Sequence, residues 1–423
     1  MDIVRRMDSR AAQRALERLY GERADKQLWR YKALAKKFAE RFGREDFKFF
    51  SAPGRTEILG NHTDHNGGRV LAGSINLDTI AAASPRGDGK ITVNSEGFDR
   101  EFCLELSELG PVYSEQGTTN GLIRGIAARF KQLGMNIGGF DACIMSDVLR
   151  GSGLSSSASV EVLICQIFSQ FYNDGKVSVM DIAQISQYAE NQYFGKPCGL
   201  MDQAAVCLGG LAYMDFEVPS EPKTAKLDFD FDKSGYALCL VKVGSDHADL
   251  TFEYAAIPDE MQAIAGEFGC KRLCEVDPAV FDAAVPQLRE KYGDRAVLRA
   301  IHYWYENGLV DKRWEDLVAG DIESFLVHTR ASGASSAMFL QNVSATVGDV
   351  REQHAMLALG LAERILDGRG AARIHGGGFG GSIQCFVPLD LVDEFIARMD
   401  TWLGEGSCRK YSITEEGACA TWM

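Results

Sequence analysis

The feature that most constrains the fold is a glycine- and serine-rich segment between a predicted strand and a predicted helix. The segment is Gly151-Ser-Gly-Leu-Ser-Ser-Ser-Ala158. Before it, residues 140–146 alternate apolar and polar side chains, which predicts a strand. After it, apolar side chains between residues 160 and 171 recur at the spacing of an amphipathic helix. This order places a pliable loop directly at a helix N-terminus.

Such a loop is suited to an anion. Glycines let the backbone curve closely around a ligand, and the free N–H groups at a helix start attract negative charge. The three serine hydroxyls add donors for phosphate or for a hydrated cation. No Gly-Lys-Ser/Thr follows, so this is not a Walker A loop. We expect a phosphate-binding loop, and the alternative is a connector whose serines only cap the helix.

A second glycine-rich segment, His375-Gly-Gly-Gly-Phe-Gly-Gly381, contains the spacing GxGxxG. Residues 382–387 after it favour a strand, whereas a dinucleotide-binding site needs a helix there. A Rossmann site is therefore excluded. Two alternatives remain, a tight hairpin or a backbone that another group approaches closely.

A third segment gathers polar side chains between apolar stretches: Pro53-Gly-Arg-Thr-Glu-Ile-Leu-Gly-Asn-His-Thr-Asp-His-Asn66. His62, Asp64 and His65 could suggest a metal, but zinc needs three or four such ligands and no further Cys/His cluster accompanies them. Closely spaced donors and acceptors suit a polyhydroxylated ligand, and the alternative is a solvated loop.

A fourth segment, from Ala189 to Gln203, carries two carboxylates on either side of a Gly-Lys-Pro turn. Glu190 could face a metal and Asp202 a reacting hydroxyl, or the reverse. Taken singly, each is typical of a surface carboxylate.

Composition excludes several classes of function. The 423 residues include 59 acidic against 45 basic side chains, a net charge of −14, which argues against nucleic acid as a partner. No stretch approaches the roughly 18 apolar residues of a membrane span. The eleven cysteines form no CxxC pair, and the first ten residues do not resemble a secretory signal. We expect a cytoplasmic protein without a nucleic-acid, membrane or obligate protein partner.

The remaining pattern mixes strands and helices without a long parallel βαβ series, which predicts the α+β class. Residues 47–49 predict a short strand that turns at 51–54, and residues 215–235 predict a domain junction. Helices are expected over residues 28–42, 179–194, 252–268, 296–306, 346–366 and 391–403, and further strands within 68–83, 372–374 and 383–387.

Together the four segments resemble the galactokinase branch of the GHMP small-molecule kinases, from about residue 47 to the end of the chain. The resemblance implies an N-terminal domain over residues 46–222 similar to ribosomal protein S5 domain 2. It also implies a ferredoxin-like C-terminal domain over 223–423, with the active site between them. Residues 1–45 form a helical extension that no motif explains, and we expect it to pack against the first domain.

The resemblance also implies an activity, the transfer of a phosphoryl group from ATP to the anomeric hydroxyl of galactose with Mg²⁺. Arg55 and Asp202 match the catalytic pair, and Ser157 and Glu190 match the Mg²⁺ pair. An Asp facing an Arg keeps a low pKa, so we expect Asp202 to orient the hydroxyl and take its proton late. The implied nucleotide-binding residues are Gly151, Ser152, Gly153, Leu154, Ser155, Ser156, Ser157 and Ala158. The implied sugar-binding residues are Asn61, His62, Asp64, Gly199, Asp202 and Tyr254.

Two positions depart from the family motif Gly-Glu-His-Thr-Asp-Tyr-Asn: Asn61 replaces the glutamate and His65 the tyrosine. A neutral amide near the sugar's 6-position would not repel a negative group, so galacturonate stays open beside galactose. N-Acetylgalactosamine also stays open, as does a non-catalytic sugar and ATP sensor on the same scaffold. A mevalonate- or homoserine-like acceptor fits the His-Thr-Asp motif less well.

Overall fold

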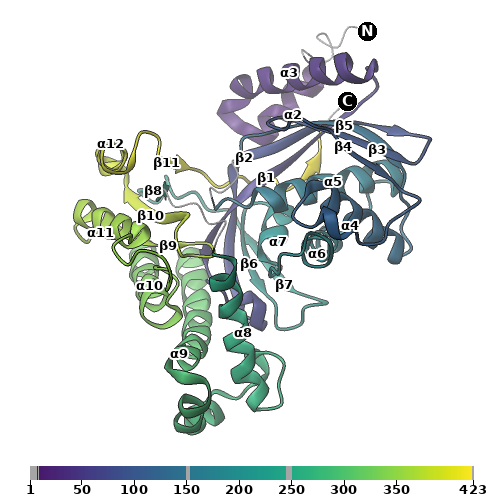
Figure 1. Ribbon diagram of the computed structural model, residues 1–423. Coiled ribbons are helices and arrows are strands. Elements are labelled where there is room, and N and C mark those ends of the chain that lie inside the picture. The colour runs from purple at the N-terminus through teal and green to yellow at the C-terminus, as the bar shows by residue number, and fades with distance from the viewer. Residues whose placement is uncertain (1–6, 8, 149–152, 244–249, 422–423) are drawn as a thin grey trace.

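The computed structural model of the chain describes residues 7, 9–148, 153–243 and 250–421. These residues form two sheets with helices packed against them (Figure 1). The first sheet has eight strands in the order β12-β1-β2-β5-β3-β4, with β6 and β7 attached beside β2. The second has four strands in the order β11-β8-β10-β9. The predicted α+β class is confirmed.

The first sheet is built on two long antiparallel strands, β1 and β2. Its other pairings are antiparallel except that between β3 and β5. The strands are β1 (Lys48–Leu59), β2 (Arg69–Arg86), β3 (Lys90–Ser95), β4 (Phe102–Glu105), β5 (Gly139–Ser146), β6 (Leu211–Asp215), β7 (Lys223–Leu227) and β12 (Cys419–Ala420).

Strand β1 corrects one expectation. The turn predicted at residues 51–54 is wrong, because the strand continues to Leu59. The pairing with β2 shifts between Pro53 and Arg55, so an irregularity in the register absorbs Pro53 and Gly54 without ending the strand. Such a shift re-aims the next side chain, which here is Arg55.

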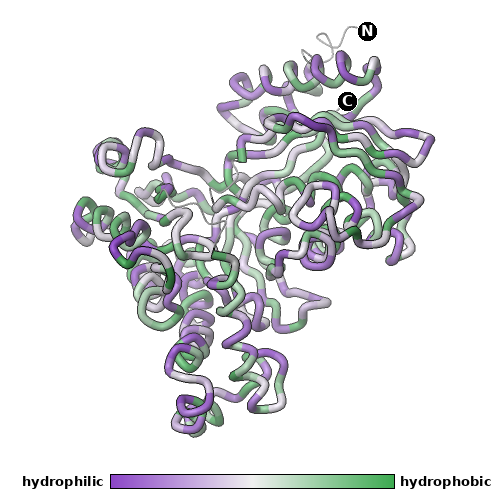
Figure 2. Tube along the Cα trace, in the orientation of Figure 1, coloured by the Kyte–Doolittle hydropathy of each residue, from purple (hydrophilic) through white to green (hydrophobic). Residues whose placement is uncertain are grey.

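Helices cover both faces of the first sheet (Figure 1). One face packs against α4 (Thr119–Gln132), α5 (Ser156–Tyr172), α6 (Val179–Ala189) and α7 (Met201–Leu208). The other face packs against α2 (Arg10–Tyr20) and α3 (Ala24–Phe42), which alternate hydrophilic and hydrophobic stretches along the chain (Figure 2). The helix expected at 179–194 is found as α6 followed by a π-helical turn over residues 190–194, and Gly195 in the left-handed region ends it.

The second half of the chain holds the second sheet and a helical layer. The strands are β8 (Tyr236–Lys242), β9 (Ala371–His375), β10 (Ser382–Pro388) and β11 (Cys408–Tyr411). The helices are α8 (Thr251–Glu267), α9 (Pro278–Ala319, interrupted at Gly293), α10 (Ile322–Ser335), α11 (His354–Leu366) and α12 (Val392–Leu403). An apolar core joins this sheet to α11 and α12. None of the described helices is both long and apolar enough to cross a membrane.

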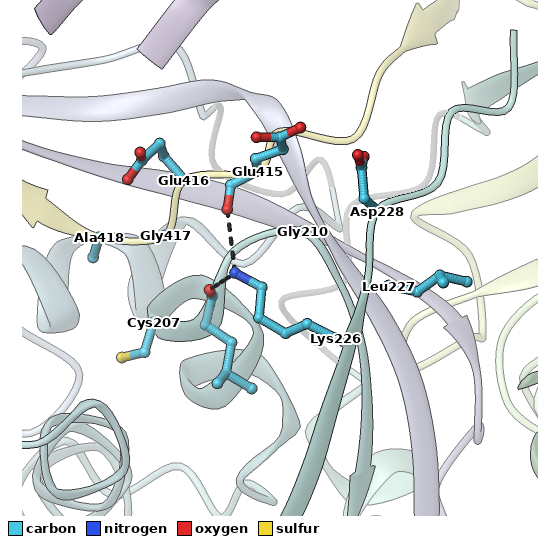
Figure 3. Close-up of a pocket in the computed structure, with 10 residues that line it drawn as sticks. Cys207, Gly210, Lys226, Leu227, Asp228, Glu415, Glu416, Gly417 and Ala418 are labelled. Atoms are coloured by element: carbon cyan, nitrogen blue, oxygen red, sulfur yellow. Dashed lines mark hydrogen bonds between the residues drawn. The ribbon is translucent and has the colours of Figure 1, made fainter. Parts of the chain in front are cut away.

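The end of the chain crosses back to the first sheet. Ala420 pairs with Phe50 on β1, and the N–H of Ala418 donates to the carbonyl of Val206 at the end of α7 (2.9 Å). Beside them, the Lys226 ammonium donates to the carbonyls of Leu208 (2.7 Å) and Glu415 (3.3 Å) (Figure 3). The domain division after residue 222 stays a proposal, and the strand pairing favours counting β7 and β12 with the first domain.

Candidate active site

Arg55 lies at the register shift of β1 and joins three parts of the chain. Its Nε donates to Oδ1 of Asp202 at 2.7 Å, and its Nη1 donates to the carbonyl of Gly153 at 2.5 Å. Its backbone N–H donates to the carbonyl of Leu154 at 3.2 Å. The structure therefore brings together the arginine, the carboxylate and the serine-rich loop that the sequence separates widely.

Asp202 stands in the first turn of α7 and is fixed at both carboxylate oxygens. Oδ1 accepts from Arg55, and Oδ2 accepts from the hydroxyl of Ser155. Burial raises the pKa of Asp202, but the charge and hydrogen bond of Arg55 and the Ser155 hydroxyl outweigh it, so this pKa lies below its usual value. About a third of the side chain (30%) remains exposed. Asp202 is thus an oriented, ionised acceptor that solvent or a ligand can reach.

The serine-rich loop leads into α5, which begins at Ser156. Gly151 and Ser152 lie outside the described residues. Gly153 takes a φ of +74°, and a Cβ there would lie 2.8 Å from the Ser382 hydroxyl, so the loop passes close to the start of β10. Ser155 is also in the left-handed region, while Ser156 and Ser157 open the helix and Ala158 is buried. The predicted order of strand, loop and helix is present.

Ser157 and Glu190 form a second polar pair beside this loop. The Ser157 hydroxyl donates to Oε1 of Glu190 at 3.3 Å. Gln203, which follows Asp202, donates to Oε2 of Glu190 (2.8 Å) and to a carboxylate oxygen of Glu161 (3.1 Å). Burial, and then the charge of Glu190, raise the pKa of Glu161 well above its usual value. Sequence reasoning missed Gln203, although it adjoins Asp202 in the same motif.

The donor set of this pair fits Mg²⁺. Within the described part of the chain, no group of three or more His, Cys, Asp or Glu is arranged to hold a metal ion. Mg²⁺ does not need such a group, because it keeps several waters and substrate phosphates and takes one or two oxygen ligands from the protein. The hydroxyl of Ser157 and the buried carboxylate of Glu190 are ligands of that kind.

Asp64, in the segment of residues 53–66, lies against Gly199, in the segment of residues 189–203 that also carries Asp202. Its Oδ1 accepts from the backbone N–H of His65 at 3.0 Å. A Cβ on Gly199 would lie only 1.7 Å from Oδ2 of Asp64, so the carboxylate occupies the space that a side chain at 199 would need. The His65 ring stacks on His62 with centroids 5.9 Å apart, and its Nε2 lies 3.8 Å from Asp64.

The glycine-rich loop between β9 and β10 closes over the same segment. The two strands are antiparallel and pair Ser382 with His375, so both the hairpin and the close approach are found, and the rejection of a Rossmann site agrees with the structure. The carbonyl of Gly377 lies 2.9 Å from Nε2 of His62, and the Tyr254 hydroxyl donates to the carbonyl of Gly378 at 3.0 Å. Burial, and then His65, lower the pKa of His62 to about 3, so its ring is neutral.

Asn61 lies among partners from within the protein. The prediction placed its amide near the sugar's 6-position, but the side chain is fully buried. Its Nδ2 lies 3.2 Å from Glu57 Oε2 and 2.5 Å from the carbonyl of Gly376, and its Oδ1 accepts from Asn342 at 2.6 Å. Glu57 in turn is paired with Arg373 at 2.7 Å, with both side chains buried. These internal partners use both ends of the amide, and a contact of Asn61 with a sugar stays a prediction.

Comparisons with known proteins agree with this geometry. A galactokinase galactose-binding signature matches residues 36–85, and the GHMP kinase N-terminal domain matches residues 121–210. The chain is 31% identical to a galactokinase of Actinobacillus pleuropneumoniae over 364 residues, covering 84% of this chain and 89% of the relative. It is 27% identical to a galactokinase of Clostridium tetani over 367 residues, with 86% and 89% covered.

Among solved structures, the galactokinase of Lactococcus lactis complexed with galactose matches with a TM-score of 0.79 at 26% identity. The match covers 92% of this chain and 99% of that one. The fold is therefore the two-domain GHMP kinase fold that the motifs predicted. By its sequence, its fold and the order of its motifs, the chain belongs to the galactokinase family of the GHMP kinases.

Proposed function

We propose that the protein transfers the γ-phosphoryl group of ATP to the anomeric hydroxyl of galactose and releases α-galactose 1-phosphate and ADP. The observation that carries the proposal is the contact of Arg55 with Asp202 at the mouth of the serine-rich loop. The relatives in Actinobacillus and Clostridium are named galactokinases, and the Lactococcus structure was solved with galactose, which supports this sugar.

In this proposal Asp202 holds and then accepts the proton of the anomeric hydroxyl. Its lowered pKa makes it a weak base at neutral pH, so the proton moves late, as the phosphorus–oxygen bond forms. Arg55 faces the same point and offsets the negative charge of the transferring group, since a guanidinium can span carboxylate and phosphoryl oxygens. Alignment and charge neutralisation are the main demands of phosphoryl transfer, and this pair supplies both.

The serine-rich loop is the proposed nucleotide site. Its residues from 153 to 158 curve between β10, Arg55 and the start of α5, so backbone N–H groups at the helix start can face phosphate. Ser157 and Glu190 would hold Mg²⁺, which shields the phosphate charge of ATP when bound. Gln203 fixes the carboxylate of Glu190 through its hydrogen bond.

The proposed sugar site consists of His62, Asp64, Gly199 and Tyr254 next to Asp202. Asp64 is the acceptor for paired hydroxyls, and leaving such a buried acceptor unpaired costs about 1–3 kcal/mol, which selects between hydroxyl epimers. Because the amide of Asn61 is used internally, a neutral residue at position 61 no longer argues for galacturonate. Galactose is the preferred acceptor, in a cytoplasmic reaction that requires only the sugar and Mg-ATP.

The proposal is tested by incubating the purified protein with Mg-ATP and measuring ADP release and the phosphorylated product. The panel contains galactose, galacturonate, N-acetylgalactosamine, mevalonate and homoserine. We expect galactose to give the highest kcat/KM and a product phosphorylated at the anomeric position. If no acceptor raises ADP release above the ATPase background, the proposal is wrong, and calorimetric binding of galactose and ATP without turnover would indicate a sensor.

A further inference from the structure

The N-terminal extension lies on the face of the first sheet opposite α4 to α7 (Figure 1). Its apolar side chains form a core with β1, β2 and β5, which explains why the two helices fold onto the sheet. The members of this core include Leu16, Leu19, Tyr31, Leu34, Phe38, Phe49, Ile80 and Cys143. If the contact were apolar throughout, the extension would only shield this face of the sheet from water. A polar cluster at the centre of the contact indicates a further role.

The cluster is centred on the buried carboxylate of Asp78 on β2. It accepts from the hydroxyls of Tyr20 (2.5 Å) and Ser51 (2.6 Å) and from Nη1 of Arg30 (2.7 Å). A buried charge is costly unless it is paired and hydrogen-bonded. Two of its three side-chain partners, Tyr20 on α2 and Arg30 on α3, come from the extension. The first sheet therefore carries a charge that it cannot satisfy alone.

Arg30 also reaches the start of the connection from β5 to α5. Its Nη1 lies 3.0 Å from Oδ2 of Asp147, and its Nη2 donates to the carbonyl of Asp78 at 3.1 Å. That same carbonyl accepts the backbone N–H of Asp147 at 3.0 Å. Arg30 is 3% exposed, so one buried guanidinium clamps both the strand β2 and the first residue after β5. Asp147 lies four positions before Gly151, the first residue of the serine-rich segment.

Neighbouring contacts connect Asp147 with the face of the sheet on which Arg55 and the serine-rich loop lie. A Cβ on Gly54 would lie 3.2 Å from a methyl group of Val148 and 3.1 Å from the carbonyl of Leu154, so both ends of the loop pack on the register shift that precedes Arg55. Ser159 in the first turn of α5 bonds the Thr79 hydroxyl at 2.8 Å, next to Asp78 in sequence. Val148 before the loop, Leu154 within it and Ser159 after it thus all contact β1 or β2.

We propose that Arg30 is a positioning residue for the nucleotide loop. By holding Asp147 against Asp78, it fixes the end of β5 and the place of Val148, which packs on Gly54 beside the carbonyl of Leu154 in the loop. The extension then belongs to the nucleotide site although it lies on the far face of the sheet. The inference rests on the proposed function only in taking Mg-ATP as the ligand of the loop.

The test compares nucleotide binding with stability. Asp147→Ala removes the exposed partner and leaves the pairing of Arg30 with Asp78, so we expect severalfold weaker Mg-ATP binding with an unchanged galactose KM and urea midpoint. Arg30→Met should weaken Mg-ATP binding more than Asp147→Ala does, because it removes the guanidinium from both Asp147 and Asp78. Arg30→Lys keeps the positive charge and should retain part of the Mg-ATP affinity that Arg30→Met loses. The matched control is Arg41→Met on the same helix, which removes a guanidinium that pairs with Glu101 instead.

Mg-ATP affinity is measured directly by calorimetry on the full chain, beside KM for ATP and for galactose. If Asp147→Ala and Arg30→Met bind Mg-ATP as tightly as the wild type, the inference is wrong, even if Arg30→Met lowers the urea midpoint, because Arg30 would then serve stability alone. A wild-type protein that binds no Mg-ATP would contradict both this inference and the proposed function. If the wild type turns over galactose and the Arg30 and Asp147 variants bind Mg-ATP normally, the inference is wrong and the proposed function stands.

Discussion

The state of Asp202 depends on residues that lie far from it in sequence. Burial alone would favour the neutral carboxyl, and the opposing contacts come from Arg55 on β1 and from Ser155 before α5. The lowered pKa of Asp202 therefore depends on the placement of the strand, the loop and α7. This dependence makes Asp202 a sensitive probe of the proposed reaction.

We predict that Asp202→Asn lowers kcat about 10²- to 10⁴-fold, the range in which a lost general base usually falls. The amide cannot accept the proton and is a weaker partner for Arg55, but it keeps the shape of the side chain. Mg-ATP binding, measured by calorimetry, should stay near the wild-type value. The exposed Asp228→Asn serves as a control, and an Asp202→Asn enzyme with wild-type kcat would remove Asp202 from its role.

We further predict that Gly199→Ala raises the galactose KM severalfold and leaves the ATP KM and the urea midpoint unchanged. The added methyl group would lie 1.7 Å from Oδ2 and 2.3 Å from Cγ of Asp64, so the carboxylate must turn away from it. The protein then folds, but the proposed sugar acceptor is displaced. Gly87→Ala, where no atom lies within 4 Å of the new methyl group, is the control. An unchanged galactose KM would indicate that Asp64 does not contact the sugar.

Single residues also show what the sequence can and cannot predict. The approach of Arg55 to Asp202 was predicted because both motifs resemble those of the galactokinases, which implies that the two residues share one site. The burial of Asn61 was not, because its partners come from three distant segments, at Glu57, Gly376 and Asn342. Arg30 gave no signal either, since a basic residue on an amphipathic helix is usually solvated. Local sequence patterns do not reveal hydrogen-bond partners that lie far apart in the chain.

At the scale of elements, periodicity found most of the described helices but fewer than half of the strands, and it misplaced some ends. β1 was expected to turn at Pro53 and Gly54, yet its pairing with β2 continues past a register shift. The helix expected from residue 346 begins only at His354, and Gly348 in the intervening stretch takes a φ of +95°. The first error arises because pairing with β2 accommodates Pro53 and Gly54, and the second because Gly348 takes a backbone conformation that a helix cannot contain.

The β9–β10 loop gives a prediction at this scale. Gly377→Ala would place a methyl group 2.4 Å from the Tyr254 ring, so we expect a higher galactose KM. Gly376→Ala is the matched control, because its methyl group meets no atom within 4 Å and only the φ of +64° is strained. That strain costs roughly 1–2 kcal/mol, which urea unfolding measures. Equal galactose KM values for the two variants would exclude a role for Tyr254 in the sugar site.

At the scale of the whole molecule, buried polar contacts join the two halves of the chain. His302 on α9 lies 2.9 Å from the carbonyl of Asn61 through Nε2 and 2.8 Å from the Ser335 hydroxyl through Nδ1. A neutral ring satisfies both contacts, with Nε2–H donating to the carbonyl and Nδ1 accepting from the hydroxyl. Arg373 on β9 pairs with Glu57 on β1 beside it. The sugar motif is thus held by the second half of the chain, and its geometry depends on the protonation of His302.

This dependence predicts a loss of stability in acid. Burial lowers the pKa of His302, although the charge of Glu306 opposes the shift, so the folded state stays unprotonated where the unfolded histidine binds a proton. Below about pH 6.5, the free energy of unfolding should fall by about 1.4 kcal/mol per pH unit for this residue, until its folded-state pKa is reached.

The measurement is the difference in unfolding free energy between the wild type and His302→Gln, followed by urea titration from about pH 7.5 to about pH 5.5. Glutamine cannot titrate, and all other groups are shared, so the difference isolates His302. The wild type should lose stability relative to the variant as the pH falls. Parallel curves for the wild type and His302→Gln would mean that the contact between α9 and the sugar motif survives protonation.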